Sequence, residues 1–218
     1  MEYQNHQIKC CIKDFGMMSY EEAYQLQKRH MEEAVSYQKN FVLLGEHPPI
    51  LTLGRLTKKE HLLVSRDLLQ QKGVAIKDVD RGGDITLHAP GQLVVYPIFC
   101  LEQLGKDLKK YLIQLEQVAI DLLNDFGIVA NRLEGKTGVW VKEKKIASVG
   151  IGVKKWVTFH GIGINIQTDL DLFSFIKPCG LDVVMTSLAE LKKDVFSMEE
   201  VKSKVITHLV RIFNLELK

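Results

Sequence analysis

A cysteine and a lysine in this chain have the local settings of a nucleophile and its activating amine. Cys179 lies between Pro178, which fixes the approach of the chain, and Gly180, which leaves the thiol uncrowded. Lys145 follows Lys144 in a strand-like run, and alternation sends the two side chains to opposite faces, so that one faces inward if the strand is buried on one side. An ammonium group within a few ångströms of a thiol favours the reactive thiolate. Taken singly, such a cysteine is usually an inert apolar residue and such a lysine a solvated edge charge.

A glycine-rich segment supplies candidate residues for holding a substrate. Paired glycines let a ligand approach the backbone closely, because no Cβ stands in the way. Arg81 could pair with an anion, and His88 could donate or accept a proton. The alternative is a tight loop whose glycines only satisfy a positive φ. The segment consists of Arg81, Gly82, Gly83, Asp84, Ile85, Thr86, Leu87, His88, Ala89, Pro90, Gly91 and Gln92.

Several other kinds of site lack their sequence patterns. The glycine-rich segment has no Gly-Lys-Ser/Thr ending, so nucleotide use is not indicated. There is no G-x-S-x-G elbow, and no G-x-G-x-x-G follows a strand. None of the seven histidines forms a zinc-binding spacing, and a metal bridged by His88 and His160 is not favoured. We therefore expect no metal and no cofactor.

Composition and charge narrow the class of protein further. The chain has 218 residues and a formal net charge of +2, which gives no reason to expect nucleic-acid or anionic-membrane binding. The four cysteines are too few and too unevenly spaced for a disulfide framework, which predicts a reducing compartment. Acidic and basic residues mix in the first thirty positions, unlike a targeting segment. We expect a cytoplasmic protein.

The elements that must position these residues can be read from periodicity. Helices are predicted over about 20–37, 66–72 and 106–126 and from Ser197 onward, with a capping box at Ser19 and Glu22. The predicted strands cover 41–44, 50–53, 74–79, 84–87, 93–98, 137–142, 145–153, 156–160 and 162–166. Short turns at 143–144 and 154–155 favour antiparallel hairpins. The sequence therefore predicts an α+β fold with a largely antiparallel sheet and flanking helices. We expect a single catalytic domain over 1–218, with a small subdomain after about residue 180 as an option.

Ordered blocks between about residues 41 and 187 resemble the lipoyl (octanoyl) transferase family, the octanoyl-acyl-carrier-protein:protein N-octanoyltransferases. The blocks are Glu46-His47-Pro48-Pro49, Thr52-Leu53-Gly54, Arg81-Gly82-Gly83 with Thr86 and His88, Pro90-Gly91-Gln92-Leu93 with Tyr96-Pro97, Gly138-Val139-Trp140, Lys145-Ile146-Ala147-Ser148-Val149-Gly150, Phe159-His160-Gly161, Asn165, Pro178-Cys179-Gly180 and Met185-Thr186-Ser187-Leu188. The resemblance implies the fold of biotin and lipoate protein ligases. It also implies transfer of an octanoyl group from octanoyl-acyl carrier protein to a lysine of lipoyl domains, as in 2-oxoacid dehydrogenases and the glycine cleavage H protein. The implied oligomeric state is a monomer.

The same resemblance assigns roles to individual residues. It implies that Cys179 is the acyl-accepting nucleophile and Lys145 the amine that keeps it ionised. The implied substrate-binding residues are Arg81, Gly82, Gly83, Asp84, Ile85, Thr86, Leu87, His88, Ser148, Val149, Gly150, Gly161, Ile162 and Gly163. The chain departs from the family pattern at Leu87, Ala89 and Gly163, which puts the preferred acyl length in question.

The expected mechanism is a two-step route through an acyl-cysteine. An apolar slot formed by Val149, Ile162 and Ile164 with the Gly82-Gly83 backbone would hold the acyl chain. Backbone amides near Gly161 or Gly180 would hold the oxyanion. Passing from a thioester to an amide is downhill, so no nucleotide is needed. Two alternatives stay open: an ATP-dependent lipoate-protein ligase, and a module that binds acyl groups or lipoyl domains without catalysis.

Overall fold

Two β-sheets form the framework of the protein. The computed structural model describes residues 7–180 and 182–218. Its strands are β1 (Ile8–Met17), β2 (Asn40–Glu46), β3 (Ile50–Leu53), β4 (Ala75–Asp78), β5 (Ile85–His88), β6 (Gln92–Ile98), β7 (Asn131–Leu133), β8 (Lys136–Val141), β9 (Lys144–Lys154), β10 (Val157–Asn165) and β11 (Leu215–Leu217). In this described part the large sheet has the order β11-β1-β2-β6-β10-β9-β8-β7 and the small one β4-β3-β5. Neighbours are antiparallel from β2 across to β7, whereas β1 runs parallel to β2 and to β11.

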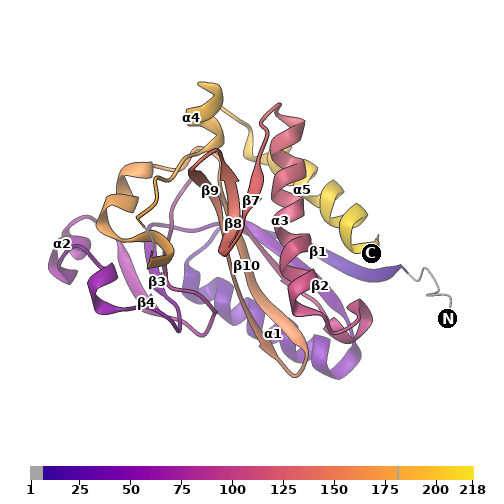
Figure 1. Cartoon of the computed structure of the whole chain (residues 1–218). Coiled ribbons are helices and arrows are strands. Elements are labelled where there is room, and N and C mark those ends of the chain that lie inside the picture. The colour runs from indigo at the N-terminus through magenta and orange to yellow at the C-terminus, as the bar shows by residue number, and fades with distance from the viewer. Residues whose placement is uncertain (1–6, 181) are drawn as a thin grey trace.

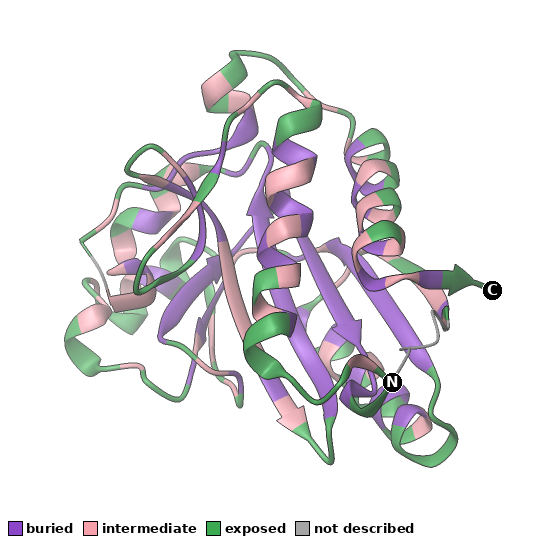
Figure 2. Ribbon diagram, turned by 45° about the vertical axis from the view of Figure 1, so that its right-hand side comes forward, coloured by how far each residue is buried: buried purple, intermediate pink, exposed green. Residues whose placement is uncertain are grey.

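Helices cover both faces of the large sheet (Figure 1). They are α1 (Tyr20–Tyr37), α2 (Arg66–Gln71), α3 (Leu108–Asp125), α4 (Leu188–Lys192) and α5 (Met198–Phe213), with 3-10 turns η1 (Lys59–His61), η2 (Leu101–Leu104), η3 (Leu170–Phe175) and η4 (Pro178–Gly180). Helices α3 and α5 share one apolar cluster with the sheet, and α1 packs on the other face. Strand β2 contributes side chains to the apolar clusters on both faces, because Val42 belongs to the first cluster and Phe41 to the second. The central strands are consequently buried along most of their length (Figure 2).

Most predicted elements are present, and the differences have local causes. Ser19 caps α1 by accepting from the Glu22 amide at 3.3 Å, as predicted. The segments 156–160 and 162–166 form one strand, β10. Gly161 does not break it, because its missing Cβ makes room for the Val95 carbonyl oxygen, which would lie 2.1 Å from such an atom. Helix α3 begins two residues later than predicted, because Asp107 is its N-cap.

Three strands and one helix escaped the helix and strand predictions. They are β1, β7, β11 and α4. Both β7 and β11 span three residues, which is too short for a periodic signal. The C-terminal elements pack on the rest of the protein, with α5 against α3 and β11 paired with β1. In the described residues no helix is both long and apolar enough to cross a membrane.

Candidate functional site

Of the two adjacent lysines, one of which was predicted to face inward, Lys145 is the buried one. Lys145, near the start of β9, is only 1% exposed, whereas Lys144 is partly exposed and pairs with Glu190. The Lys145 Nζ donates to the Thr137 carbonyl oxygen at 2.8 Å and lies 3.1 Å from the Cys179 Sγ. The Trp140 ring packs beside it, with its centroid 5.2 Å from Nζ. A buried ammonium needs such partners, because desolvation without them is costly.

Cys179 sits in the tight turn η4 with a strained backbone. Its φ of 58° and ψ of 23° are left-handed, a conformation that costs a non-glycine residue free energy and often marks a functional position. Gly180 follows with φ +69°, and a Cβ there would lie 2.6 Å from the Asp84 Oδ2. The turn therefore lies in close contact with Asp84 of the glycine-rich segment. Cys179 itself is partly exposed.

Backbone hydrogen bonds anchor this turn on both sides. Before it, the Lys177 amide donates to the His61 carbonyl oxygen at 2.8 Å. After it, the Lys145 amide donates to the Val184 carbonyl oxygen, and the Thr186 amide donates back to the Lys145 carbonyl oxygen, both at 2.9 Å. The segment that follows Cys179 is thus paired with the lysine's own residue. This pairing fixes the separation of the sulfur and the amine.

A cavity of about 450 Å³ opens in front of the pair, large enough for a small ligand. The predicted site residues that line it are Arg81, Gly82, Gly83, Asp84, Thr86, His88, Lys145, Ser148, Val149, Gly150, Gly161, Ile162, Gly163 and Cys179. Ile85 and Leu87 are not among the lining residues and pack instead in an apolar cluster behind β5. Side chains alternate along a strand, so only Thr86 and His88 of β5 can face the cavity.

The expected acyl slot and the expected oxyanion site each need one correction. Val149 and Ile162 line the cavity, but Ile164 does not, because it is fully buried in the core beneath α3. The Gly180 amide donates to the Lys177 carbonyl oxygen at 2.9 Å, so it is not free to hold an oxyanion. Among the three departures from the family pattern, Leu87 and Ala89 belong to the core, and only Gly163 reaches the cavity.

Arg81 holds its own loop in place. Its guanidinium donates to the Thr52 carbonyl oxygen at 2.8 Å, to the Thr52 hydroxyl at 2.9 Å and to the Gly82 carbonyl oxygen at 3.1 Å. The Gly82 amide in turn donates to the Ile151 carbonyl oxygen at 2.8 Å, which ties the loop to β9. The paired glycines therefore bring backbone up to the cavity wall. Burial lowers the pKa of Arg81, and the predicted anion pairing has no partner among these contacts.

Neutral histidines form the polar end of the cavity. Burial lowers the pKa of His88 to about 3, and its Nδ1 donates to the side-chain Oε1 of Gln92 at 2.7 Å. Burial also lowers the pKa of His160, whose Nε2 donates to Asp80 at 3.0 Å while Nδ1 accepts from the Tyr20 hydroxyl at 3.2 Å. The hydrogen bond from the His160 Nε2 is the main reason why the pKa of Asp80 falls to about 2. The predicted proton exchange at His88 is therefore disfavoured near neutral pH.

Buried neutral histidines make stability depend on pH. Burial also lowers the pKa of His47 to about 4. When the pH is below 6.5, the ordinary pKa of histidine, both His47 and His88 therefore take up a proton as the protein unfolds. Their contribution is complete above that value and is lost as the pH falls toward 4. The free energy of unfolding should drop by about 2 kcal/mol per histidine by about pH 5. Denaturant titrations at several pH values measure this. His47→Gln should remove the share of one histidine, about 2 kcal/mol at pH 5, and an unchanged slope would contradict the assignment.

The cavity includes residues outside the catalytic and substrate-binding sets that the resemblance implied. They are Tyr20, Leu56, Gln92, Tyr96, Leu112, Gly135, Lys136, Thr137, Ile151 and His160. Tyr20 lies on the apolar face of α1, a signal that indicates burial but not which cavity it borders. Tyr96, Gln92 and His160 stood in the matching blocks without an assigned role. In the described residues, no group of three or more His, Cys, Asp or Glu side chains is placed to hold a metal.

Comparisons with known proteins place this geometry in a family. A model described as the lipoyl protein ligase A/B catalytic domain matches residues 19–210. The octanoyltransferase of Solibacter usitatus is 42% identical over 213 residues, covering 95% of this chain and 94% of the relative. That of Caldicellulosiruptor saccharolyticus is 44% identical over 206 residues, covering 93% and 88%.

Solved structures support the fold prediction. A chain from the structure of the bi-partite lipoate protein ligase and its E2 lipoyl domain from Thermoplasma acidophilum has a TM-score of 0.70 at 15% identity, covering 97% of this chain and 86% of that one. The biotin protein ligase of Aquifex aeolicus has a TM-score of 0.55 at 20% identity, covering 94% and 70%. The predicted α+β fold of biotin and lipoate protein ligases is confirmed.

Proposed function

Because the chain belongs to the octanoyltransferase family and carries its lipoyl protein ligase A/B catalytic domain, we propose that it moves an octanoyl group through a Cys179 thioester. The donor is octanoyl-acyl carrier protein and the acceptor a lysine of a lipoyl domain. The contact that carries this proposal is the 3.1 Å separation of Lys145 Nζ and Cys179 Sγ at the cavity wall. An amine this close to a thiol supports a thiolate nucleophile.

The first half-reaction loads the enzyme. The Cys179 thiolate attacks the carbonyl carbon of the donor thioester, and the bond from that carbon to the pantetheine sulfur breaks. The departing thiolate takes a proton from the Lys145 ammonium, which becomes a neutral amine. Apolar contacts with Val149 and Ile162 would hold the chain, at about 0.8 kcal/mol for each buried methylene. The products are acyl-Cys179 and the free carrier thiol.

The second half-reaction unloads the enzyme onto the acceptor. The ε-amine of the target lysine attacks the acyl-Cys179 carbonyl, an amide bond forms, and the Cys179 thiolate leaves. Neutral Lys145 takes the proton that the attacking amine loses, which restores the starting ammonium–thiolate pair. Burial lowers the pKa of both His88 and His160, so neither histidine is a good proton acceptor near neutral pH. Lys145 therefore serves both halves.

The setting of the reaction follows from the same observations. The acceptors would be lipoyl domains of 2-oxoacid dehydrogenases and the glycine cleavage H protein. The four cysteines are all free thiols, which suits a reducing cytoplasm. Packing of α5 on α3 and pairing of β11 with β1 favour one catalytic domain rather than a separate C-terminal unit. We expect it to act as a monomer without metal or cofactor.

An assay with two donors tests this function against its alternatives. Octanoyl-acyl carrier protein and an unmodified lipoyl domain should yield the octanoylated domain without nucleotide, as seen by intact-protein mass spectrometry. Octanoate with ATP should yield neither that product nor pyrophosphate. Product formation only with ATP would favour a lipoate-protein ligase, and tight complexes without product would favour a binding module. Either result overturns the proposal.

A further inference from the structure

One peptide bond links the reactive lysine to a buried carboxylate on α3. The Thr137 carbonyl oxygen accepts from Lys145 Nζ at 2.8 Å, and the Gly138 amide donates to the Glu116 Oε1 at 2.8 Å. Both groups belong to the same planar unit, since the carbonyl of one residue and the amide of the next rotate together. The carboxylate therefore sets the direction in which the Thr137 oxygen points, and that oxygen is one of the two polar partners of the lysine amine.

The lysine stem leaves this peptide little room to turn. Gly138 has a φ of +122°, and a Cβ there would lie 2.6 Å from the Lys145 Cε and 2.5 Å from the Ala147 carbonyl oxygen. A glycine is required because the backbone passes directly against the side chain of Lys145. A rotation of the Thr137–Gly138 plane would thus remove the hydrogen bond to Nζ and change the space around the stem together.

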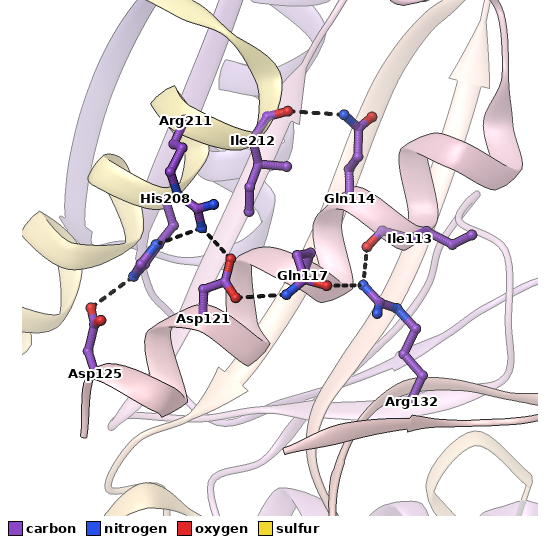
Figure 3. Close-up of polar contacts among 9 residues, drawn as sticks. All are labelled: Ile113, Gln114, Gln117, Asp121, Asp125, Arg132, His208, Arg211 and Ile212. Carbon is purple, nitrogen blue, oxygen red and sulfur yellow. Dashed lines mark hydrogen bonds and ion pairs between the residues drawn. The ribbon is translucent and has the colours of Figure 1, made fainter. Parts of the chain in front are cut away.

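The carboxylate of Glu116 is itself braced. It is 7% exposed, and its Oε2 accepts from the Arg132 Nε at 3.0 Å. Arg132 also donates to the Ile113 carbonyl oxygen at 2.6 Å and to the Gln117 side chain at 3.0 Å (Figure 3). Gln117 donates in turn to Asp121, which pairs with Arg211 of α5. The α3–α5 layer therefore fixes the orientation of the carboxylate.

We propose that Glu116 is a positioning residue that holds the Lys145 amine against Cys179 through the Thr137–Gly138 peptide. Glu116 does not line the cavity, so it acts through another group rather than on the substrate. The proposal rests on the proposed Cys179–Lys145 chemistry. Other charged groups near the sulfur are Arg81 on the cavity wall and the Asp84–His61 pair against Gly180. None of them contacts the peptide that Glu116 holds.

Two conservative variants separate this role from simple stabilisation. Glu116→Asp keeps the charge beside Arg132 but is one methylene too short to reach the Gly138 amide. Glu116→Gln keeps the reach and an accepting oxygen but loses the ion pair. Alkylation of Cys179 by iodoacetamide, followed by peptide mass spectrometry over a range of pH, reports its thiolate. Glu116→Asp should slow alkylation near neutral pH about tenfold and move the profile to higher pH, whereas Glu116→Gln should stay close to wild type.

Thermal unfolding of the same variants should rank them in the opposite order. Glu116→Gln loses the ion pair between a buried carboxylate and the partly exposed Arg132, and it should be the less stable of the two. Asp125→Asn, which removes the charge from the contact between α3 and His208 of α5, is the matched control and should leave the alkylation profile unchanged. A wild-type profile in Glu116→Asp, or equal shifts in both variants, would overturn the proposal. The failure of the proposed function would be distinct, because wild-type protein would then form no acyl adduct at Cys179.

Discussion

Cys179→Ala is expected to form no acyl adduct and to lose turnover by on the order of 10⁴-fold or more. Among the described residues that line the cavity, Cys179 carries the one thiol, and its sulfur lies 3.1 Å from the Lys145 Nζ. Alanine accepts the left-handed backbone of Cys179 as poorly as cysteine does, so the strain in η4 stays the same and the fold should persist. Intact-protein mass spectrometry after incubation with octanoyl-acyl carrier protein measures the adduct, and transfer to a lipoyl domain measures turnover.

Cys11→Ala is the matched control for this experiment. Cys11 is another partly exposed thiol, but it lies in β1 and does not line the cavity. Its variant should load and transfer at wild-type rates. If the Cys179→Ala protein still carried an octanoyl group that passed on to the lipoyl domain, another residue would be the carrier and Cys179 would leave the mechanism.

Strand alternation allowed one half of this site to be predicted from the sequence. Lys145 and Lys144 are adjacent, and burial on one side forces one of them inward. The structure identifies Lys145 as that residue. Alternation also explains why not every residue of the block 81–88 lines the cavity, as the resemblance implied. Ile85 and Leu87 point into the core, while Thr86 and His88 face the cavity. A contiguous motif does not distinguish the two faces of its own strand.

The other half depends on contacts that no local pattern contains. Cys179 reaches Lys145 because the segment after it pairs with β9 at Lys145 and the segment before it bonds to His61. These partners lie 34 or more residues away in the sequence, and His61 belongs to the short 3-10 turn η1, which has no periodic signal. The same limit applies to Glu116. In the sequence Glu116 is an ordinary polar residue of a predicted helix. Only the folded structure shows that its carboxylate accepts from the Gly138 amide.

Lys145→Arg is expected to separate the two half-reactions. Arginine keeps a positive charge near Cys179, so the acyl adduct should still form. Loading should be slower, because the head group is larger and arginine does not give up the proton that Lys145 donates to the departing thiolate. Arginine stays protonated, however, and cannot take the proton that the attacking amine must lose. Transfer from preloaded acyl-enzyme to the lipoyl domain should therefore fall by about 10²- to 10⁴-fold, which is the usual size of a general-base contribution.

Single-turnover kinetics on the two halves test this expectation directly. Loading is followed by the appearance of the adduct, and unloading by its decay after addition of the lipoyl domain. Lys145→Met, which keeps the stem without charge or proton, should impair both halves, because the thiolate loses its counterion as well. Lys144→Met is the matched control, since Lys144 lies on the opposite face of β9 and pairs with Glu190 instead. Wild-type unloading by Lys145→Arg would show that Lys145 acts only as a charge, and the proton would then need another acceptor.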